Sequence, residues 1–243
     1  MLHSNFSSMK HDPAFCSKVH TKHHQSVCWS GAVRIEQINI GSRTLLTVNG
    51  RKRETGIFKE LSEGPIAVCE LGLPGDAICD RKHHGGPDQA IYLYSVEDYA
   101  WWAEALGQDV PAGTFGENFT TSGQDLCGIC VGDVLFSESV TLQVSAPRIP
   151  CSTLASRMGD KQFAKKFMKA GRSGAYCRVL ETGDVQAGDE LAHRPYDGDR
   201  IPLQTFFKDA HSKLSADQLG RYLAAPIDER TRRDFSRKMA ASP

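Results

Sequence analysis

The sequence predicts a mixed α/β protein that is mainly β, with a barrel-like core, peripheral helices and a small C-terminal helical domain. Three observations lead to this fold class. Between residues 31 and 194, many short strand-like runs are separated by glycine-containing turns. Helical patterns are few there and do not alternate with strands, as parallel βαβ units would require. After about Pro195 the pattern becomes helical and charged.

Short strand-like runs are expected throughout residues 31–194. Each combines alternating or continuous apolar residues with a turn at its end. They are AVRIEQINI at 32–40, TLLTVNG at 44–50, GPIAVCEL at 64–71, QAIYLY at 89–94, VTLQV at 140–144, and VGDVLF at 131–136, whose Gly-Asp turn is echoed by AGDELA at 187–192.

Two helices are expected within the core. One follows Ser95, which is a good N-cap, carries Glu97 and Asp98 in its first turn, and ends at Gly107. The other is DKQFAKKFMKAG at 160–171, where Phe163 and Phe167 share one face.

The remaining residues divide into a leader and an extension around a domain at 31–194. Residues 1–30 hold five of the nine histidines and one acidic residue without periodicity, which favours a disordered leader. Residues 196–243 are expected to form three helices, the second opened by a Ser215–Gln218 capping box. The last carries Arg230, Arg232, Arg233, Arg237 and Lys238, which are typical of a solvated helix face but would also suit an acidic partner or nucleic acid.

Composition excludes several classes of protein. Lys plus Arg equals Asp plus Glu at 29 each, so global charge gives no reason to expect binding to membranes or to nucleic acid as a polymer. No apolar run reaches the ~18 residues of a membrane helix, and no secretory signal opens the chain. The eight scattered cysteines do not form a disulfide framework. We expect a cytoplasmic protein.

Cys151 is the strongest candidate for chemistry. Pro147 and Pro150 fix the backbone on both sides of Arg148 just before this thiol, and a short helix is expected from Ser152. A helix N-terminus and a nearby guanidinium both favour the thiolate, which attacks electrophiles or ligates a soft metal. A buried cysteine at a strand end is the alternative.

A second candidate is the segment GLPGDAICDRKHHGGPDQAIYLY at 72–94. Its glycines, including Gly85 and Gly86, permit close backbone approach to a ligand, and Arg81, His83 and His84 add donors and positive charge suited to an anion. A glycine-rich hairpin with a basic edge is equally consistent with the segment.

Three further features carry weaker signals. Asn118 in GTFGENFTTSG offers an amide that both donates and accepts hydrogen bonds. Lys59 in GIFKEL lies between apolar residues, which is also typical of a lysine whose ammonium reaches solvent. Cys127 and Cys130 form a lone CxxC without a second metal-binding pair, which favours ordinary packing over a redox or zinc site.

Taken together, TGIFKE, GLPGD, HHGGPDQAIYLY, FGENFT, VGD and PRIPC resemble, in this order, the MOSC domain family and its YiiM-like branch. The resemblance covers residues 31–194, and the helical tail is similar to the three-helix extension of that branch. It implies a β-barrel-like fold that binds a molybdenum cofactor, with Cys151 as the protein ligand of the metal. It further implies a molybdenum-dependent oxidoreductase that reduces N-hydroxylated compounds, such as hydroxylaminopurine-type base analogues and amidoximes, with electrons from an external donor protein.

The resemblance also suggests roles for other residues. Lys59 matches a lysine that binds the pterin phosphate in the related amidoxime-reducing branch, and Asn118 matches the asparagine of its Phe-x-x-Asn motif. That branch has arginines where this chain has Gly116 and Ala77. His83 and His84 are candidate proton donors near neutral pH, with Asp88 orienting one imidazole. Arg81, Gly85, Gly86, Asp88 and Arg148 complete the expected cofactor site.

Two other functions stay open at this point. Cys151 would serve equally well as the carrier of a persulfide in a sulfur transferase, because the same thiolate is required. A non-catalytic binding module, in which the basic C-terminal helix recruits a partner, is the third interpretation.

Overall fold

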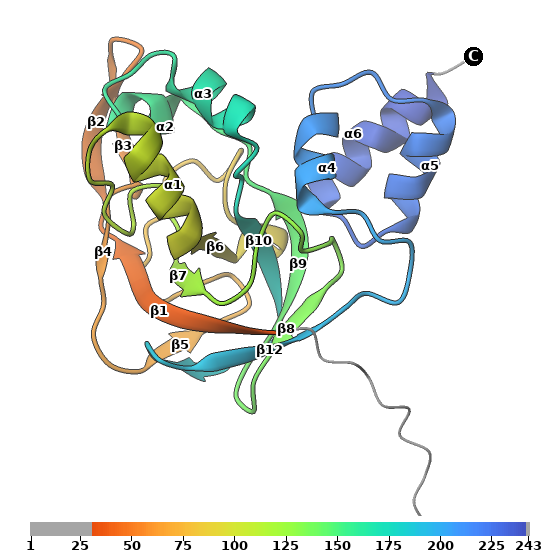
Figure 1. The fold of residues 1–243 in the computed structure, drawn as a ribbon. Coiled ribbons are helices and arrows are strands. Elements are labelled where there is room, and N and C mark those ends of the chain that lie inside the picture. Colours follow the sequence, from red (N-terminus) through yellow and green to blue (C-terminus); the bar gives the residue numbers. More distant parts are fainter. Residues whose placement is uncertain (1–30, 242–243) are drawn as a thin grey trace, which may run out of the picture.

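A closed ring of seven strands forms the centre of the protein (Figure 1). The structure is a computed structural model that describes residues 31–241. Around the ring, each strand pairs with the next and the last pairs with the first. In ring order the strands are β1 (Ala32–Gly41), β12 (Glu190–Arg194), β8 (Val134–Phe136), β9 (Thr141–Pro147), β10 (Ala175–Glu181), β6 (Ile91–Ser95) and β7 (Phe119–Ser122).

The long strand β1 closes the ring because it pairs with two partners along its length. Its first residues pair with β12, and the residues that follow pair with β7 across an irregularity between Ile35 and Gln37. A bulge of this kind bends a strand and increases its twist, which closure of a small barrel requires. The expected barrel-like, mainly β core is confirmed.

Smaller strand pairs lie around the ring. Strand β4 (Lys59–Leu61) pairs with the end of β1. Strands β2 (Thr44–Val48) and β3 (Arg51–Thr55) form a hairpin, and β5 (Ile66–Val68) pairs with β11 (Gly183–Val185). The pair β6–β7 is parallel, unlike the other ring pairs in the described part of the chain, because the connection between them crosses over through a helix.

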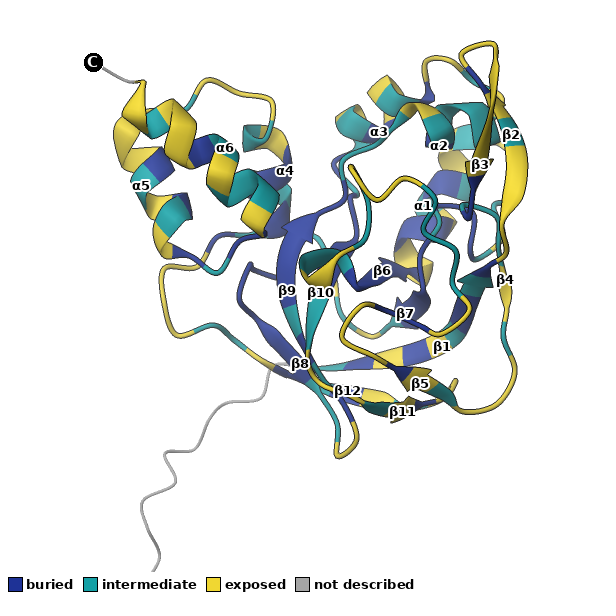
Figure 2. Ribbon diagram, turned by 180° about the vertical axis from the view of Figure 1, so that it is seen from behind, coloured by how far each residue is buried: buried dark blue, intermediate teal, exposed yellow. Residues whose placement is uncertain are grey.

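Three helices pack near one another on the barrel: α1 (Val96–Leu106), α2 (Ser152–Arg157) and α3 (Phe163–Ala170) (Figures 1 and 2). The expected caps of α1 are confirmed, since Ser95 accepts a hydrogen bond from the Asp98 amide and Gly107 adopts the left-handed conformation. Phe163 and Phe167 of α3 pack against Trp102 of α1, with ring centroids 5.1 and 5.9 Å apart. This aromatic cluster fixes α3 against α1.

The C-terminal helices α4 (Leu203–Asp209), α5 (Ala216–Ala224) and α6 (Glu229–Ala240) gather beside the barrel, next to β9 (Figure 1). Phe206, Tyr222 and Phe235 form their shared core, with neighbouring ring centroids 4.9 and 5.3 Å apart. The Ser215–Gln218 capping box is present at the start of α5. The proposed division of the chain at 31–194 and 196–243 stays a prediction, and the predicted leader at 1–30 lies outside the described residues.

The basic residues of α6 do not share one solvated face. Arg232 donates hydrogen bonds of 2.6 Å to the carbonyls of Leu223 and Ala225 at the end of α5. Arg230 points to the barrel, whereas Arg233 is largely exposed. Part of the charge on this helix therefore serves internal contacts. None of the helices described for residues 31–241 has the length and apolarity needed to cross a bilayer.

Candidate functional site

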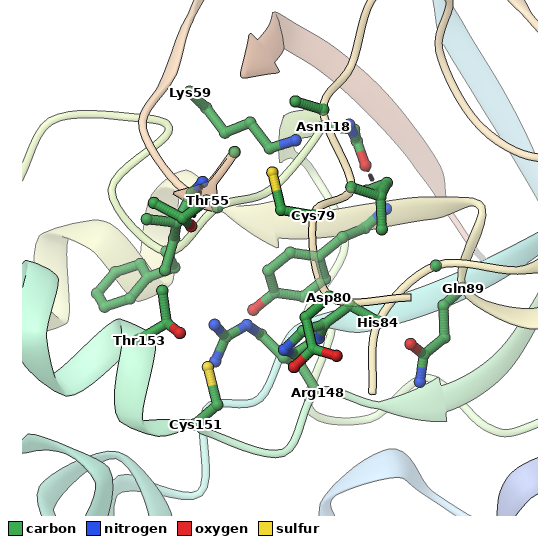
Figure 3. A pocket seen from close by; sticks show the side chains of 18 of the residues that line it. Thr55, Lys59, Cys79, Asp80, His84, Gln89, Asn118, Arg148, Cys151 and Thr153 are labelled. Atoms are coloured by element: carbon green, nitrogen blue, oxygen red, sulfur yellow. Dashed lines mark hydrogen bonds between the residues drawn. The ribbon is translucent and has the colours of Figure 1, made fainter. Parts of the chain in front are cut away.

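A cavity of about 100 Å³ opens between segments that are far apart in the sequence (Figure 3). Its walls come from the β3–β4 connection, the loop before β6, the segment before β7 and the turn between β9 and α2. Predicted site residues that line it are Lys59, His84, Gly85, Asn118, Arg148 and Cys151. In Figure 3, Cys151, Arg148 and His84 converge at one end of the cavity, and Lys59 and Asn118 lie at the other.

Cys151 lies where the chain leaves strand β9 and enters helix α2. Its backbone is extended, with φ −122° and ψ 169°, and it is the residue that precedes the expected helix at Ser152, which is confirmed. The side chain is half-buried and makes no capping hydrogen bond. Cys151 lines the cavity, so its sulfur lies at the cavity wall.

The surroundings of Cys151 favour its thiolate. Burial raises the pKa of the thiol, but a hydrogen bond from the His84 imidazole, the positive charge of Arg148 and the backbone N–H of Leu154 together lower the pKa to about 6. A thiol with this pKa is largely ionised at neutral pH. The predicted activation of Cys151 by Arg148 is supported by this geometry, and the contribution of His84 adds to it.

Arg148 is a buried cation with an unsatisfied donor. It is 4% exposed, and its guanidinium carbon lies 5.7 Å from the ring centroids of both Tyr92 and Phe167. Among the described residues its Nη1 has no hydrogen-bond partner, and it forms no salt bridge. Because leaving a buried charged donor unpaired is costly, Nη1 is available to donate to an anionic or polar group of a ligand in the cavity beside Cys151.

Lys59 and Asn118 are joined by a carboxylate that was not expected in the site. The Lys59 ammonium forms an ion pair with Asp76, and each of these side chains is only 5% exposed. The other carboxylate oxygen of Asp76 accepts a 3.0 Å hydrogen bond from the Asn118 amide. Asn118 in turn accepts one of 3.1 Å from the backbone N–H of Tyr92. Burial lowers the pKa of Lys59, although the adjacent carboxylate opposes that change.

Several predicted residues lie outside the cavity wall: Arg81, His83, Gly86 and Asp88. The expectation that Asp88 orients an imidazole is wrong. Its carboxylate accepts hydrogen bonds of 2.9 Å from Arg178 and 2.8 Å from the backbone N–H of Glu229. His83 instead pairs with Asp80 at 2.9 Å on the exposed side of the loop. Adjacent residues of a loop can face opposite sides, and the sequence does not state which one faces the cavity.

Other residues of the wall were missed by the sequence prediction. They are mainly Cys79, Asp80, Gln89, Tyr92, Thr153 and Tyr176. Asp76, which was also missed, does not line the cavity but supports its wall by bonding Lys59 and Asn118. Asp76 belongs to the GLPGD segment, so its acidic residue was a usable signal. Tyr92 and Tyr176 come from strand interiors, where nothing in the sequence distinguishes a cavity-facing ring from a core ring.

The CxxC pair does not belong to this cavity. Cys127 and Cys130 are both free thiols, and neither lines the wall. Burial, followed by the charge of Asp98, raises the pKa of Cys127 to about 12. Within residues 31–241, no group of three or more His, Cys, Asp or Glu side chains is placed to hold a metal ion.

Comparison with known proteins identifies the family. The MOSC domain profile matches residues 80–192. The uncharacterized protein YflK of Bacillus subtilis is 38% identical over 154 residues, which span 63% of this chain and 70% of YflK. The chain belongs to the MOSC domain family. The crystal structure of YiiM from Geobacillus stearothermophilus aligns with a TM-score of 0.71 and 28% identity, over 85% of this chain and 99% of that one.

The match to YiiM confirms the predicted YiiM-like branch and the mixed α/β fold. A Gibberella moniliformis protein named "Reductase" is 33% identical over 154 residues, which span 60% of this MOSC chain and 27% of that protein. Only about a quarter of that relative is therefore shared with this chain. The MOSC profile covers the part of the chain that carries His84, Asn118 and Cys151.

Proposed function

We propose that this MOSC protein is a molybdenum-cofactor-dependent reductase that converts N-hydroxylated compounds, such as hydroxylaminopurine-type bases and amidoximes, to amines. The observation that carries the proposal is a cavity in which a low-pKa thiol, Cys151, lies beside a buried guanidinium with an unsatisfied donor, Arg148. Membership of the MOSC family and the reductase name of one relative support an enzymatic function.

The residues present fit the cofactor that the family implies. A thiolate is a soft ligand of the type that molybdenum accepts, and Cys151 supplies one at the cavity wall. At the other end of the cavity, the ammonium of Lys59 would donate to the pterin phosphate, and the unsatisfied Nη1 of Arg148 would donate to a polar group of the cofactor near Cys151. When bound, the cofactor would supply the two-electron chemistry that removes the hydroxyl oxygen of the substrate.

The chain itself would supply binding and protons. His84 lines the cavity beside Cys151, so its imidazole is placed to hold a proton at a ring nitrogen near the reacting end. Tyr92 and Tyr176 add aromatic walls with hydroxyl groups, which suits a planar heterocyclic substrate. Electrons would come from an external donor protein, and we place the reaction in the cytoplasm.

Sulfur transfer is the second candidate, and the same observation supports it. A thiolate with a pKa of about 6 in an open cavity would also carry a persulfide and pass sulfur to an acceptor. Such a carrier would hold cyanide-releasable sulfur on Cys151 and no molybdenum. A binding module would instead tolerate the loss of Cys151 and depend on the C-terminal helices.

The test compares metal content and turnover in matched variants. Full-length protein is purified from cells that make molybdopterin and from cells that do not, and molybdenum is measured together with hydroxylaminopurine reduction. We expect metal only in the first preparation, and we expect Cys151→Ser to fold but lose it because a hydroxyl is a harder and less acidic ligand. Cys79→Ser, which alters the other thiol of the same cavity, should retain metal. Unchanged turnover in Cys151→Ser would refute the proposal.

A further inference from the structure

We infer that Arg230 of helix α6 is a positioning residue. It holds the loop at residues 80–86, which carries His84, against the cavity that contains Cys151, so the C-terminal helices complete the site. Arg230 lies in the first turn of α6, and its guanidinium extends to the loop that precedes β6. It does not line the cavity that contains Cys151. Its role is therefore to support His84 and not to contact the reacting groups.

Five hydrogen bonds join this guanidinium to the loop. Four of them end on backbone carbonyls of residues 81–85. Nη2 has two N–H groups for three of these carbonyls, so at least one N–H is shared between two acceptors. Nη1 donates to the carbonyl of His83 at 2.6 Å and to Oε1 of Gln89 at 3.0 Å, and Nη2 donates to the carbonyls of Gly85 at 3.1 Å, His84 at 3.4 Å and Arg81 at 3.5 Å.

The loop has some support of its own, because the amides of His83 and His84 donate to the carbonyl of Asp80 at 3.3 and 2.9 Å, but its glycines leave the residues that follow easy to bend. Gly85 and Gly86 have φ values of 71° and 85°, in the left-handed region that glycine populates freely. Turns and bends precede them, and the short 3₁₀ helix begins only at Pro87. The carbonyl of His84 is bonded to Arg230 on one side of the loop, while its imidazole reaches Cys151 on the other.

A second cavity, of about 200 Å³, lies between this loop and the C-terminal helices α4 and α6. Arg230, His83 and Thr231 line it, and it shares His84, Gln89 and Tyr176 with the cavity of Cys151. The side of the loop that faces away from Cys151 is thus not filled by tightly packed apolar side chains. Since close packing does not fix the loop there, the hydrogen bonds of Arg230 carry that role.

The support is itself anchored to the barrel. The amide of Glu229 donates to Asp88 at 2.8 Å, and the amide of Asp228 donates to the carbonyl of Ser145 at 3.2 Å. Arg178 of β10 bonds both Asp88 and the carbonyl of Ile227, at 2.9 and 3.1 Å. The start of α6 is therefore bonded to strands β9 and β10 of the ring, which fixes the backbone position of Arg230.

The test measures the reactivity of Cys151 without any cofactor, so its failure is distinct from failure of the proposed reductase function. Full-length protein from molybdopterin-deficient cells reacts with iodoacetamide at pH 7, and mass spectrometry follows the Cys151 peptide. We expect His84→Ala to slow this reaction by about tenfold, because the thiolate fraction falls as the pKa rises towards that of a free thiol. Arg230→Ala should slow it by about fivefold. The control Arg233→Ala, with a 67% exposed side chain on the same helix, should leave the rate unchanged.

The double variant separates positioning from general destabilisation. If Arg230 acts through His84, then Arg230→Ala should produce no further loss in the His84→Ala background. Arg230→Lys should give an intermediate rate, since one ammonium cannot bond all of these carbonyls. It also serves as the test variant if Arg230→Ala does not fold. Wild-type reactivity of the Arg230 variants, or fully additive losses with His84→Ala, would overturn the inference.

Discussion

His84 and Cys151 meet side chain to side chain at one end of the cavity, although one belongs to the loop before β6 and the other to the turn between β9 and α2. The imidazole favours the thiolate form of the sulfur, and Arg148 adds a positive charge nearby. A histidine beside a cysteine is the arrangement that activates thiol nucleophiles and thiolate ligands alike. The pair is therefore central to either function of Cys151.

The first prediction concerns the pH dependence of this pair. Burial raises the pKa of Cys151, but His84, Arg148 and the Leu154 amide lower it to about 6, so the rate of alkylation should rise with pH to a midpoint near 6 and then level off. In His84→Ala the midpoint should move upward by about one unit or more, because a group that stabilises the thiolate is lost. His83→Ala should keep the wild-type profile, since that imidazole pairs with Asp80. Equal profiles for the two histidine variants would contradict this assignment.

The second prediction concerns the buried ion pair of Lys59 and Asp76. Asp76→Asn would leave the Lys59 ammonium buried without a counter-charge, which typically costs about 3–5 kcal/mol. Urea unfolding should show this loss as a lower midpoint. Glu54→Gln is the matched control, because its ion pair with Arg43 is largely exposed and should contribute within about 1 kcal/mol. An Asp76→Asn protein as stable as the control would show that Lys59 does not depend on Asp76.

Much of the fold could be predicted from the sequence because its signals are local. Ser95 and Gly107 cap α1, and Ser215 and Gln218 form the capping box of α5. Each of these caps depends only on a few neighbouring residues. Closure of the ring could not be predicted in this way. It depends on β1 pairing with β12 at the opposite end of the core, and no pattern within either strand encodes the partner.

In the site, too, local features could be predicted from the sequence and long-range contacts could not. The residues next to Cys151 indicated a reactive thiol, because two prolines, an arginine and a helix start lie within a few positions of it. Asp88 was assigned to the wrong partner because Arg178 and the start of α6 are distant in sequence. Arg230 was grouped with a solvated helix face because its contacts lie on the other structural unit. Long-range contacts therefore account for these errors.

The third prediction concerns Asp133, whose side chain is fully buried in the turn before β8. Burial raises its pKa, but hydrogen bonds from His193 at 2.8 Å and from the Cys130 and Tyr196 amides, together with Arg200, lower the pKa below 3.8 overall. A carboxyl with a depressed folded-state pKa stabilises the protein above its unfolded-state pKa, and this contribution is lost as the pH falls through the folded-state value. Asp133→Asn should therefore cost about 3 kcal/mol at pH 7.

The difference between the wild type and Asp133→Asn should shrink as the pH falls below about 4. Urea unfolding at several pH values measures both curves. A difference that is independent of pH down to acid denaturation would show that shape, and not charge, accounts for the effect.

The last prediction concerns the CxxC pair. Burial, with nearby Asp98 and Asp125, raises the pKa of Cys127 to about 12, so this thiol is protonated at neutral pH and is neither a nucleophile nor a ready metal ligand. Neither Cys127 nor Cys130 lines the cavity of Cys151. Cys127→Ala should therefore keep metal content and turnover within about twofold of wild type, where Cys151→Ser loses both. A large loss of turnover in Cys127→Ala at unchanged stability would show that this cysteine takes part in the reaction.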